Sequence, residues 1–236
     1  MHRTAVLAAV LSLPPMLVAC TSAPPDGADA AAALDAAVLV AATGCGTAAV
    51  SGGGSFVDDD LVLTVAHVVA GSSSVRVTTV DGRSVDARVM AIDRRKDLAV
   101  LRADGGTSHL PFGDLRPGVD GVFVMWRDGS AVTERFHGEG AVDIHTDDID
   151  DDGPGRRRGY VVEADITEGD SGTVLVSSGR AVGVVFARSA EHHDRAWAVD
   201  VDEAAALLAT AHAATTPAST GACAHGPDGD ADRDDP

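Results

Sequence analysis

Short apolar runs, each interrupted by Gly, Asp or Ser, make up most of the chain from residue 36 onwards. Val-rich runs of this kind, separated by turn residues, are typical of an all-β barrel or sandwich. One helix is expected at residues 202–214, where Asp202 and Glu203 suit a helix N-terminus and precede a run of Ala and Leu. The apolar runs lie at residues 38–40, 61–63, 85–90, 98–101, 122–125, 160–162, 173–176 and 182–186.

The start of the chain has a different pattern. A short basic start, Met1-His2-Arg3, precedes a largely apolar stretch that Pro14-Pro15 interrupts. The stretch is too short to span a membrane comfortably and predicts a signal peptide over residues 1–19. It ends in Leu17-Val18-Ala19-Cys20, which resembles the bacterial lipobox, and this resemblance implies that Cys20 is lipidated and becomes the first mature residue. The alternative is an ordinary signal peptide that is cleaved elsewhere.

Composition divides the remaining chain into three parts. Residues 20–35 are expected to form a flexible tether and residues 215–236 an acidic tail, because both are rich in Ala, Pro, Gly and Asp. Residues 36–212 form the expected folded domain.

The three cysteines are Cys20, Cys45 and Cys223, and an odd number in a secreted protein needs an explanation. If Cys20 carries lipid, Cys45 and Cys223 remain to form a disulfide that ties the tail to the start of the domain. Two free buried thiols are the alternative.

The charge balance restricts the partners. The chain has 36 acidic and 18 basic residues and a formal net charge of −18. This charge argues against a nucleic-acid or anionic-membrane surface, so a lipid anchor is the one expected contact with a membrane. No cofactor is expected.

Two segments rich in possible metal ligands have simpler explanations. The acidic segment at residues 147–152 lacks the spacing of an EF-hand and is expected to be a solvated loop. The neighbours His192 and His193, with Glu191 and Asp194 beside them, are expected to lie on an exposed loop, since adjacent His side chains rarely face one ion. No metal site is therefore expected.

Three polar residues stand beside apolar runs in an informative order. His67 ends Thr64-Val65-Ala66-His67, Asp97 begins Asp97-Leu98-Ala99-Val100, and Ser171 lies in Gly169-Asp170-Ser171-Gly172. Singly, each has an ordinary structural explanation. Together they resemble the His, Asp and Ser motifs of trypsin-like serine proteases. Their short spacing and the segment Gly52–Phe56 are similar to the compact bacterial HtrA-like and MarP-like branch.

The resemblance implies a fold and a set of roles. It implies two six-stranded antiparallel β-barrels, at about residues 36–115 and 116–201, followed by the C-terminal helix. His67 would be the general base, Asp97 would orient it, and Ser171 would be the nucleophile. The N–H groups of Gly169 and Ser171 would form the oxyanion hole. Because only a short tail follows the expected helix, the PDZ domain of HtrA-like proteases is not expected.

Three further charged residues follow from the same resemblance. In zymogen-type trypsins the residue at the position of Asp170 pairs with a newly freed N-terminus. A lipidated Cys20 cannot supply that amine, so Asp170 is expected to find another partner, such as an Arg, or to stay solvated. Asp165 and Arg188 are candidates for the specificity pocket, where Arg188 could neutralise Asp165.

The sequence therefore predicts a serine endopeptidase that cleaves protein or peptide substrates through an acyl-enzyme. It would lie outside the cytoplasmic membrane, lipid-anchored or secreted. The alternative is a latent or inactive trypsin-fold lipoprotein that binds a peptide or protein partner. An esterase is disfavoured because Thr173 replaces the second Gly of the Gly-x-Ser-x-Gly elbow.

Overall fold

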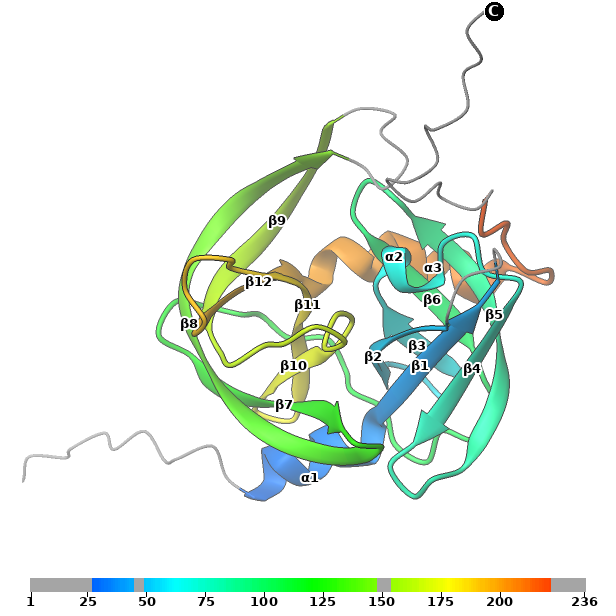
Figure 1. The fold of residues 1–236 in the computed structure, drawn as a ribbon, viewed down its shortest axis with the longest axis horizontal. Helices are drawn as coiled ribbons and strands as arrows, with labels where there is room; N and C mark the ends of the chain where they lie inside the picture. The colour runs from blue at the N-terminus through cyan, green and yellow to red at the C-terminus, as the bar shows by residue number, and fades with distance from the viewer. Residues whose placement is uncertain (1–26, 45–48, 148–153, 222–236) are drawn as a thin grey trace, which may run out of the picture.

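Two six-stranded β-barrels lie side by side in the computed structural model, which describes residues 27–44, 49–147 and 154–221 (Figure 1). The first barrel has the strand order β1-β2-β3-β6-β5-β4 and closes through antiparallel pairing of β1 with β4. Its strands are β1 (Ala37–Thr43), β2 (Val50–Phe56), β3 (Leu61–Thr64), β4 (Ser74–Thr79), β5 (Ser84–Asp93) and β6 (Leu98–Arg102).

The second barrel repeats this plan with the order β10-β11-β12-β9-β8-β7. It closes where Val176 of β10 pairs with Val122 of β7. Its strands are β7 (Asp120–Arg127), β8 (Ser130–Asp147), β9 (Pro154–Glu163), β10 (Val174–Ser177), β11 (Arg180–Arg188) and β12 (Arg195–Asp200).

The expected all-β fold of two six-stranded barrels with a C-terminal helix is confirmed. The helical segment at the C-terminus begins as a 3-10 turn, η1 (Val201–Ala204), and continues as α3 (Ala205–Ala213). Some strands were not expected because they have no unbroken apolar run. In β4, for example, buried Val75 and Val77 alternate with exposed Ser74 and Arg76, a period-two pattern that is too short to stand out.

The N-terminal segment differs from the expected tether. Residues Gly27–Ala36 form helix α1, which packs against the second barrel before the chain enters β1 of the first (Figure 1). Ala is the strongest helix former, and the small side chains of Ala33 and Ala36 are buried. The carboxylate of Asp29 accepts hydrogen bonds from the N–H groups of Ser178 and Gly179, at 2.9 and 2.7 Å. The segment is therefore a docked element over these residues.

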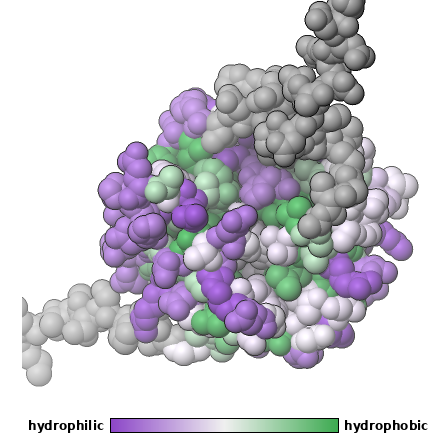
Figure 2. Space-filling view, in the orientation of Figure 1, coloured by the Kyte–Doolittle hydropathy of each residue, from purple (hydrophilic) through white to green (hydrophobic). Residues whose placement is uncertain are grey.

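The described part of the tail runs back along the first barrel. Ala218 N–H donates to the Val89 carbonyl at 2.8 Å, and Gly71 N–H donates to the Thr220 carbonyl at 2.7 Å. The signal peptide, all three cysteines and the acidic residues 148–152 lie outside the described residues. On the face of the molecule that is turned to the viewer in Figure 1, apolar residues form separate patches among hydrophilic ones (Figure 2).

None of the described helices combines the length and the apolar character needed to cross a membrane. Within the same residues, no group of three or more His, Cys, Asp or Glu side chains is placed to hold a metal ion.

Candidate active site

His67 and Asp97 form a close pair on the first barrel. His67 lies in the single helical turn α2 (Ala66–Val69) that follows β3, and Asp97 directly precedes β6. His67 Nδ1 is 2.8 Å from Asp97 Oδ2, and the backbone N–H of His67 donates to Asp97 Oδ1 at 2.9 Å. Because an ionised carboxylate only accepts hydrogen bonds, this contact places the proton on Nδ1 and leaves Nε2 as the basic nitrogen.

The backbone at Asp97 is unusual. Its φ is +53°, although its side chain is buried and 8% exposed. Non-glycine residues rarely adopt this conformation, and such outliers concentrate at functional sites where surrounding contacts hold them. The conformation of Asp97 is held by the two contacts that its carboxylate makes with His67.

Ser171 lies in the turn before β10 of the second barrel, and this turn rests on β2 of the first. The N–H of Gly53 donates to the Ser171 carbonyl at 2.7 Å. A Cβ at Gly52 would lie 2.5 Å from that carbonyl oxygen and 2.7 Å from a side-chain methyl of Val68, so Ser171 lies next to the turn that carries His67. In the described part of the chain the Ser171 hydroxyl has no hydrogen-bond partner. Hydrogen bonds between a catalytic serine and its histidine are often long in a free enzyme and tighten only when substrate binds.

Glycine is required at Gly172, directly after the serine. A Cβ there would lie 2.3 Å from the Gly53 carbonyl oxygen and 2.4 Å from Thr64 Oγ1. The N–H of Gly172 donates to the Val185 carbonyl of β11 at 2.8 Å. The turn is therefore fixed between a strand of each barrel.

Asp170 finds a partner in Arg127, at the end of β7. Arg127 makes two parallel hydrogen bonds to the carboxylate, NH1 to Oδ1 at 2.7 Å and NH2 to Oδ2 at 2.8 Å. Thr167 adds its N–H at 2.8 Å and its hydroxyl at 3.0 Å, both to Oδ2. The side chain of Asp170 is 1% exposed and that of Arg127 is 36% exposed. The hydrogen bonds that Arg127 donates to Asp170 raise the pKa of Arg127 above its usual value, so the guanidinium stays charged.

These contacts fold residues 167–170 into a tight turn that orients two backbone donors. Gly169 has a φ of +94°, which side chains rarely tolerate. Among the described residues, neither the Gly169 N–H nor the Ser171 N–H donates to a protein acceptor. Two N–H groups on one turn beside a serine can stabilise a developing oxyanion.

Asp165 and Arg188 are both exposed, and the structure records no ion pair between them within the described residues. Their segments are neighbours, because the Ala164 N–H donates to the Asp194 carbonyl at 2.8 Å and the Ser189 N–H donates to the Arg195 carbonyl at 2.8 Å. The expected neutralisation of Asp165 by Arg188 is therefore not seen as a direct contact.

Sequence reasoning did not find Arg127, which the structure links to the serine turn. Arg127 ends an apolar strand and precedes Asp128-Gly129, a pattern that indicates a hairpin turn and nothing else. The sequence predicts an Arg as one possible partner for Asp170, but the chain has many arginines and only the closure of the second barrel selects Arg127.

Two β-barrels, with a His–Asp pair on the first and a Gly-Asp-Ser-Gly turn on the second, define the class of trypsin-like folds. A family model described as the trypsin-like peptidase domain matches residues 52–184, more than half of the chain. The chain therefore belongs to the trypsin-like peptidase family.

Individual relatives agree with this assignment. Serine protease Rv3671c of Mycobacterium tuberculosis is 33% identical over 184 residues, which are 73% of this chain and 44% of that protein. The chloroplastic Protease Do-like 1 of Arabidopsis thaliana is 29% identical over 161 residues, which are 62% of this chain and 36% of that protein. The chain thus spans less than half the length of these curated relatives.

Solved structures show the same relationship. The crystal structure of the active form of the Rv3671c protease matches with a TM-score of 0.76 at 30% identity, over 91% of this chain and 99% of that one. The HtrA-type protease AlgW with a tripeptide matches with a TM-score of 0.65 at 18% identity, over 78% and 62% of the two chains, which shows the fold alone. The resemblance to the Rv3671c-like and HtrA-like proteases is confirmed, whereas the lipoprotein signal peptide stays a prediction.

Proposed function

We propose that the protein is a serine endopeptidase that uses His67, Asp97 and Ser171 as its catalytic triad. The observation that carries the proposal is the His67–Asp97 pair, 2.8 Å apart, on a barrel whose strand β2 holds the Ser171 turn of the other barrel. The family and its relatives named serine protease support it.

In this mechanism His67 Nε2 takes the proton from the Ser171 hydroxyl as the oxygen attacks the substrate carbonyl. Asp97 keeps the imidazole in the required tautomer and stabilises the imidazolium that forms. His67 then gives the proton to the leaving amine, and water hydrolyses the acyl-enzyme in a second cycle. The N–H groups of Gly169 and Ser171 would hold the oxyanion, in a turn that Arg127 and Asp170 stabilise.

Protein or peptide substrates follow from this chemistry, and the proposed groups for their selection are Asp165 and Arg188. Both are exposed on adjacent segments that flank the Ser171 turn. Substrate profiling of Asp165→Asn and Arg188→Gln tests this role. A specificity profile that neither substitution changes would remove both residues from the pocket.

The deciding experiment is labelling of the full chain with a fluorophosphonate probe, because such probes react only with activated serines. We expect the wild type to be labelled and the Ser171→Ala and His67→Ala variants to remain unlabelled. A folded wild type that does not label would contradict an enzyme that is active without a ligand. That result would favour the second candidate, a latent or inactive trypsin-fold protein that binds a peptide or protein partner.

Two covalent features complete the proposal: a lipid on Cys20 and a disulfide between Cys45 and Cys223. The proposal of a lipid is based on the resemblance of Leu17-Val18-Ala19-Cys20 to the lipobox. The disulfide is supported by the described neighbours, because a Cβ at Gly44 would lie 3.0 Å from the Gly71 carbonyl and Gly71 N–H donates to Thr220. Intact mass of the protein from its native membrane, before and after reduction, tests both.

A further inference from the structure

A buried arginine that the mechanism above does not use lies on the second barrel, on the side that faces the Asp97 loop. Arg157 belongs to β9 and is 3% exposed, while its neighbours Arg156 and Arg158 are exposed. Strand alternation accounts for the direction of the three side chains. Burial opposes the charged form of Arg157 and lowers its pKa below the usual value. A buried charge without an ion-pair partner is rare, so its presence needs a reason.

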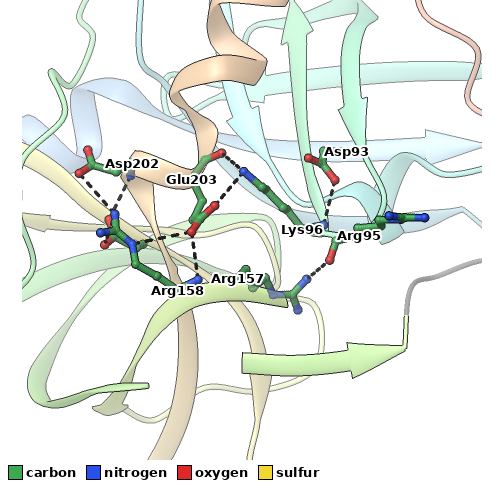
Figure 3. A network of polar contacts seen from close by, with 8 residues as sticks. Asp93, Arg95, Lys96, Arg157, Arg158, Asp202 and Glu203 are labelled. Atoms are coloured by element: carbon green, nitrogen blue, oxygen red, sulfur yellow. Dashed lines mark hydrogen bonds and ion pairs between the residues drawn. The ribbon is translucent and has the colours of Figure 1, made fainter. Parts of the chain in front are cut away.

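The contacts of Arg157 connect two segments of the site. Its guanidinium carbon lies 4.0 Å from the centre of the Phe186 ring on β11. Its NH1 group reaches toward the Arg95 carbonyl at 3.5 Å, in the loop between β5 and β6 that ends at Asp97 (Figure 3). Its buried Nε–H has no hydrogen-bond partner in the described part of the chain. These contacts do not satisfy the five donors of a guanidinium, so hydrogen bonding alone does not explain its burial.

The surrounding charges supply the explanation. The carboxylates whose charge acts on Arg157 are Asp97 and Asp93. Asp93 accepts a hydrogen bond from the Lys96 N–H at 3.0 Å. The Lys96 ammonium is paired with Glu203 at 2.8 Å, as Figure 3 shows. Lys96 is therefore neutralised by Glu203, whereas Arg157 has no direct ion pair within the described residues and its charge acts on Asp97 and Asp93 through space.

We propose that Arg157 is a positioning residue of the catalytic site, which holds the Asp97 loop across the barrel interface and places a positive charge beside the His67–Asp97 pair. The proposal rests on the proposed triad. By Coulomb's law a positive charge at this position opposes a second positive charge on the imidazole, so we expect removal of the Arg157 charge to make protonation of His67 easier.

The test compares Arg157→Met with two controls in the full chain. Arg157→Lys keeps the charge and loses the planar guanidinium. Arg156→Met removes the same charge from the adjacent exposed residue, whose partner is Asp143 at 3.0 Å. One readout is the pH at which fluorophosphonate labelling reaches half its maximal rate. The other is an NMR titration of the His67 ring in a Ser171→Ala background, with the signal assigned by His67→Gln.

We expect Arg157→Met to move both midpoints to higher pH by about half a unit or more, the direction that loss of a nearby positive charge requires. Arg157→Lys and Arg156→Met should keep the wild-type midpoints. If Arg157→Met does not fold, Arg157→Gln replaces it with the same expected shift. Unchanged midpoints in the neutral variants, with or without a fall in thermal stability, would reduce Arg157 to a structural residue and overturn the proposal.

The two readouts separate this proposal from the proposed function. If the NMR midpoint shifts but neither the wild type nor any Arg157 variant is labelled by the probe, the result would support the electrostatic role of Arg157 and contradict the peptidase activity. Normal labelling of the wild type with no shift in either readout would support the peptidase and overturn the role of Arg157.

Discussion

Replacement of Arg127 by Met removes both hydrogen bonds that Asp170 receives from β7 and leaves a carboxylate that is 1% exposed without its cation. Breaking a fully buried ion pair by removal of one partner costs about 3–5 kcal/mol. Arg127 is itself 36% exposed, and the two hydrogen bonds from Thr167 remain, so the effect here is smaller. We expect the free energy of unfolding to fall by about 2–3 kcal/mol. This is less than for a fully buried pair, partly because solvent screens the exposed side of Arg127.

That loss has two measurable consequences. A fall of this size lowers the melting temperature by roughly 5–10 °C for a domain of this length. It is also expected to release the turn at residues 167–170, which carries the proposed oxyanion donors, the Gly169 and Ser171 N–H groups. Loss of one oxyanion donor lowers kcat by about 10²–10³. The rate of fluorophosphonate labelling in Arg127→Met should therefore fall far more than partial unfolding at the assay temperature explains.

Two comparisons make the experiment decisive. Arg76→Met removes an ion pair with Asp86 whose side chains are 62% and 87% exposed, and it should change neither the melting temperature nor labelling appreciably. The double variant Arg127→Met/Asp170→Asn removes the buried charge together with its partner and should recover part of the lost stability, but not the labelling. An Arg127→Met protein that matches the wild type in melting temperature and labelling rate would refute the reasoning.

Three other substitutions test separate parts of the structure. Gly53→Ala would put a Cβ 2.3 Å from Thr173 Oγ1 and should push the serine turn off β2 and abolish labelling, whereas Gly140→Ala, with no atom within 4 Å, should label normally. Burial raises the pKa of Glu203, but hydrogen bonds, chiefly from Lys96, outweigh burial and lower the pKa below 4.5. Ionised Glu203 therefore contributes its full stability to the fold above pH 4.5, and this contribution is lost as the pH falls through the lowered pKa. Glu203→Gln should flatten the urea-measured pH dependence of stability in that acid range. Asp29→Ala should lower stability by about 1 kcal/mol in urea denaturation through loss of the hydrogen bonds to the β10–β11 turn, and an unchanged midpoint would show that α1 docks without them.

Local pattern was enough to predict an all-β barrel or sandwich, because most strands carry a run of Val and Leu that is buried on closure, and the resemblance of the three motifs supplied the two six-stranded barrels. The strand at Leu98–Arg102 is an example, with four consecutive buried residues. Helix α1 was missed because its Ala-rich sequence has no apolar stripe, and a run of small residues resembles a linker until a surface is available to cover it.

The candidate site was predictable where residues close in sequence carry a motif and unpredictable where they meet across the fold. His67, Asp97 and Ser171 each lie in a recognisable local segment. Arg127 and Arg157 do not, since each is one arginine on a strand, and its importance depends on which residue the closed barrel places opposite. Charge pattern alone even misleads at Arg157, because Arg156-Arg157-Arg158 reads as an exposed basic stretch while its central side chain is buried.

The division of the site between the barrels determines what holds it together. The His67–Asp97 pair forms within the first barrel, and the Asp170 turn is fixed by Arg127 within the second. Neither pair alone brings the proposed base His67 to the proposed nucleophile Ser171. That step depends on contacts between the barrels: the Gly53 N–H on the Ser171 carbonyl at 2.7 Å, and Arg157 on the Arg95 carbonyl. We therefore expect a change that weakens these contacts to separate His67 from Ser171 while both barrels stay folded, so the expected result of damage at this interface is loss of labelling without loss of secondary structure.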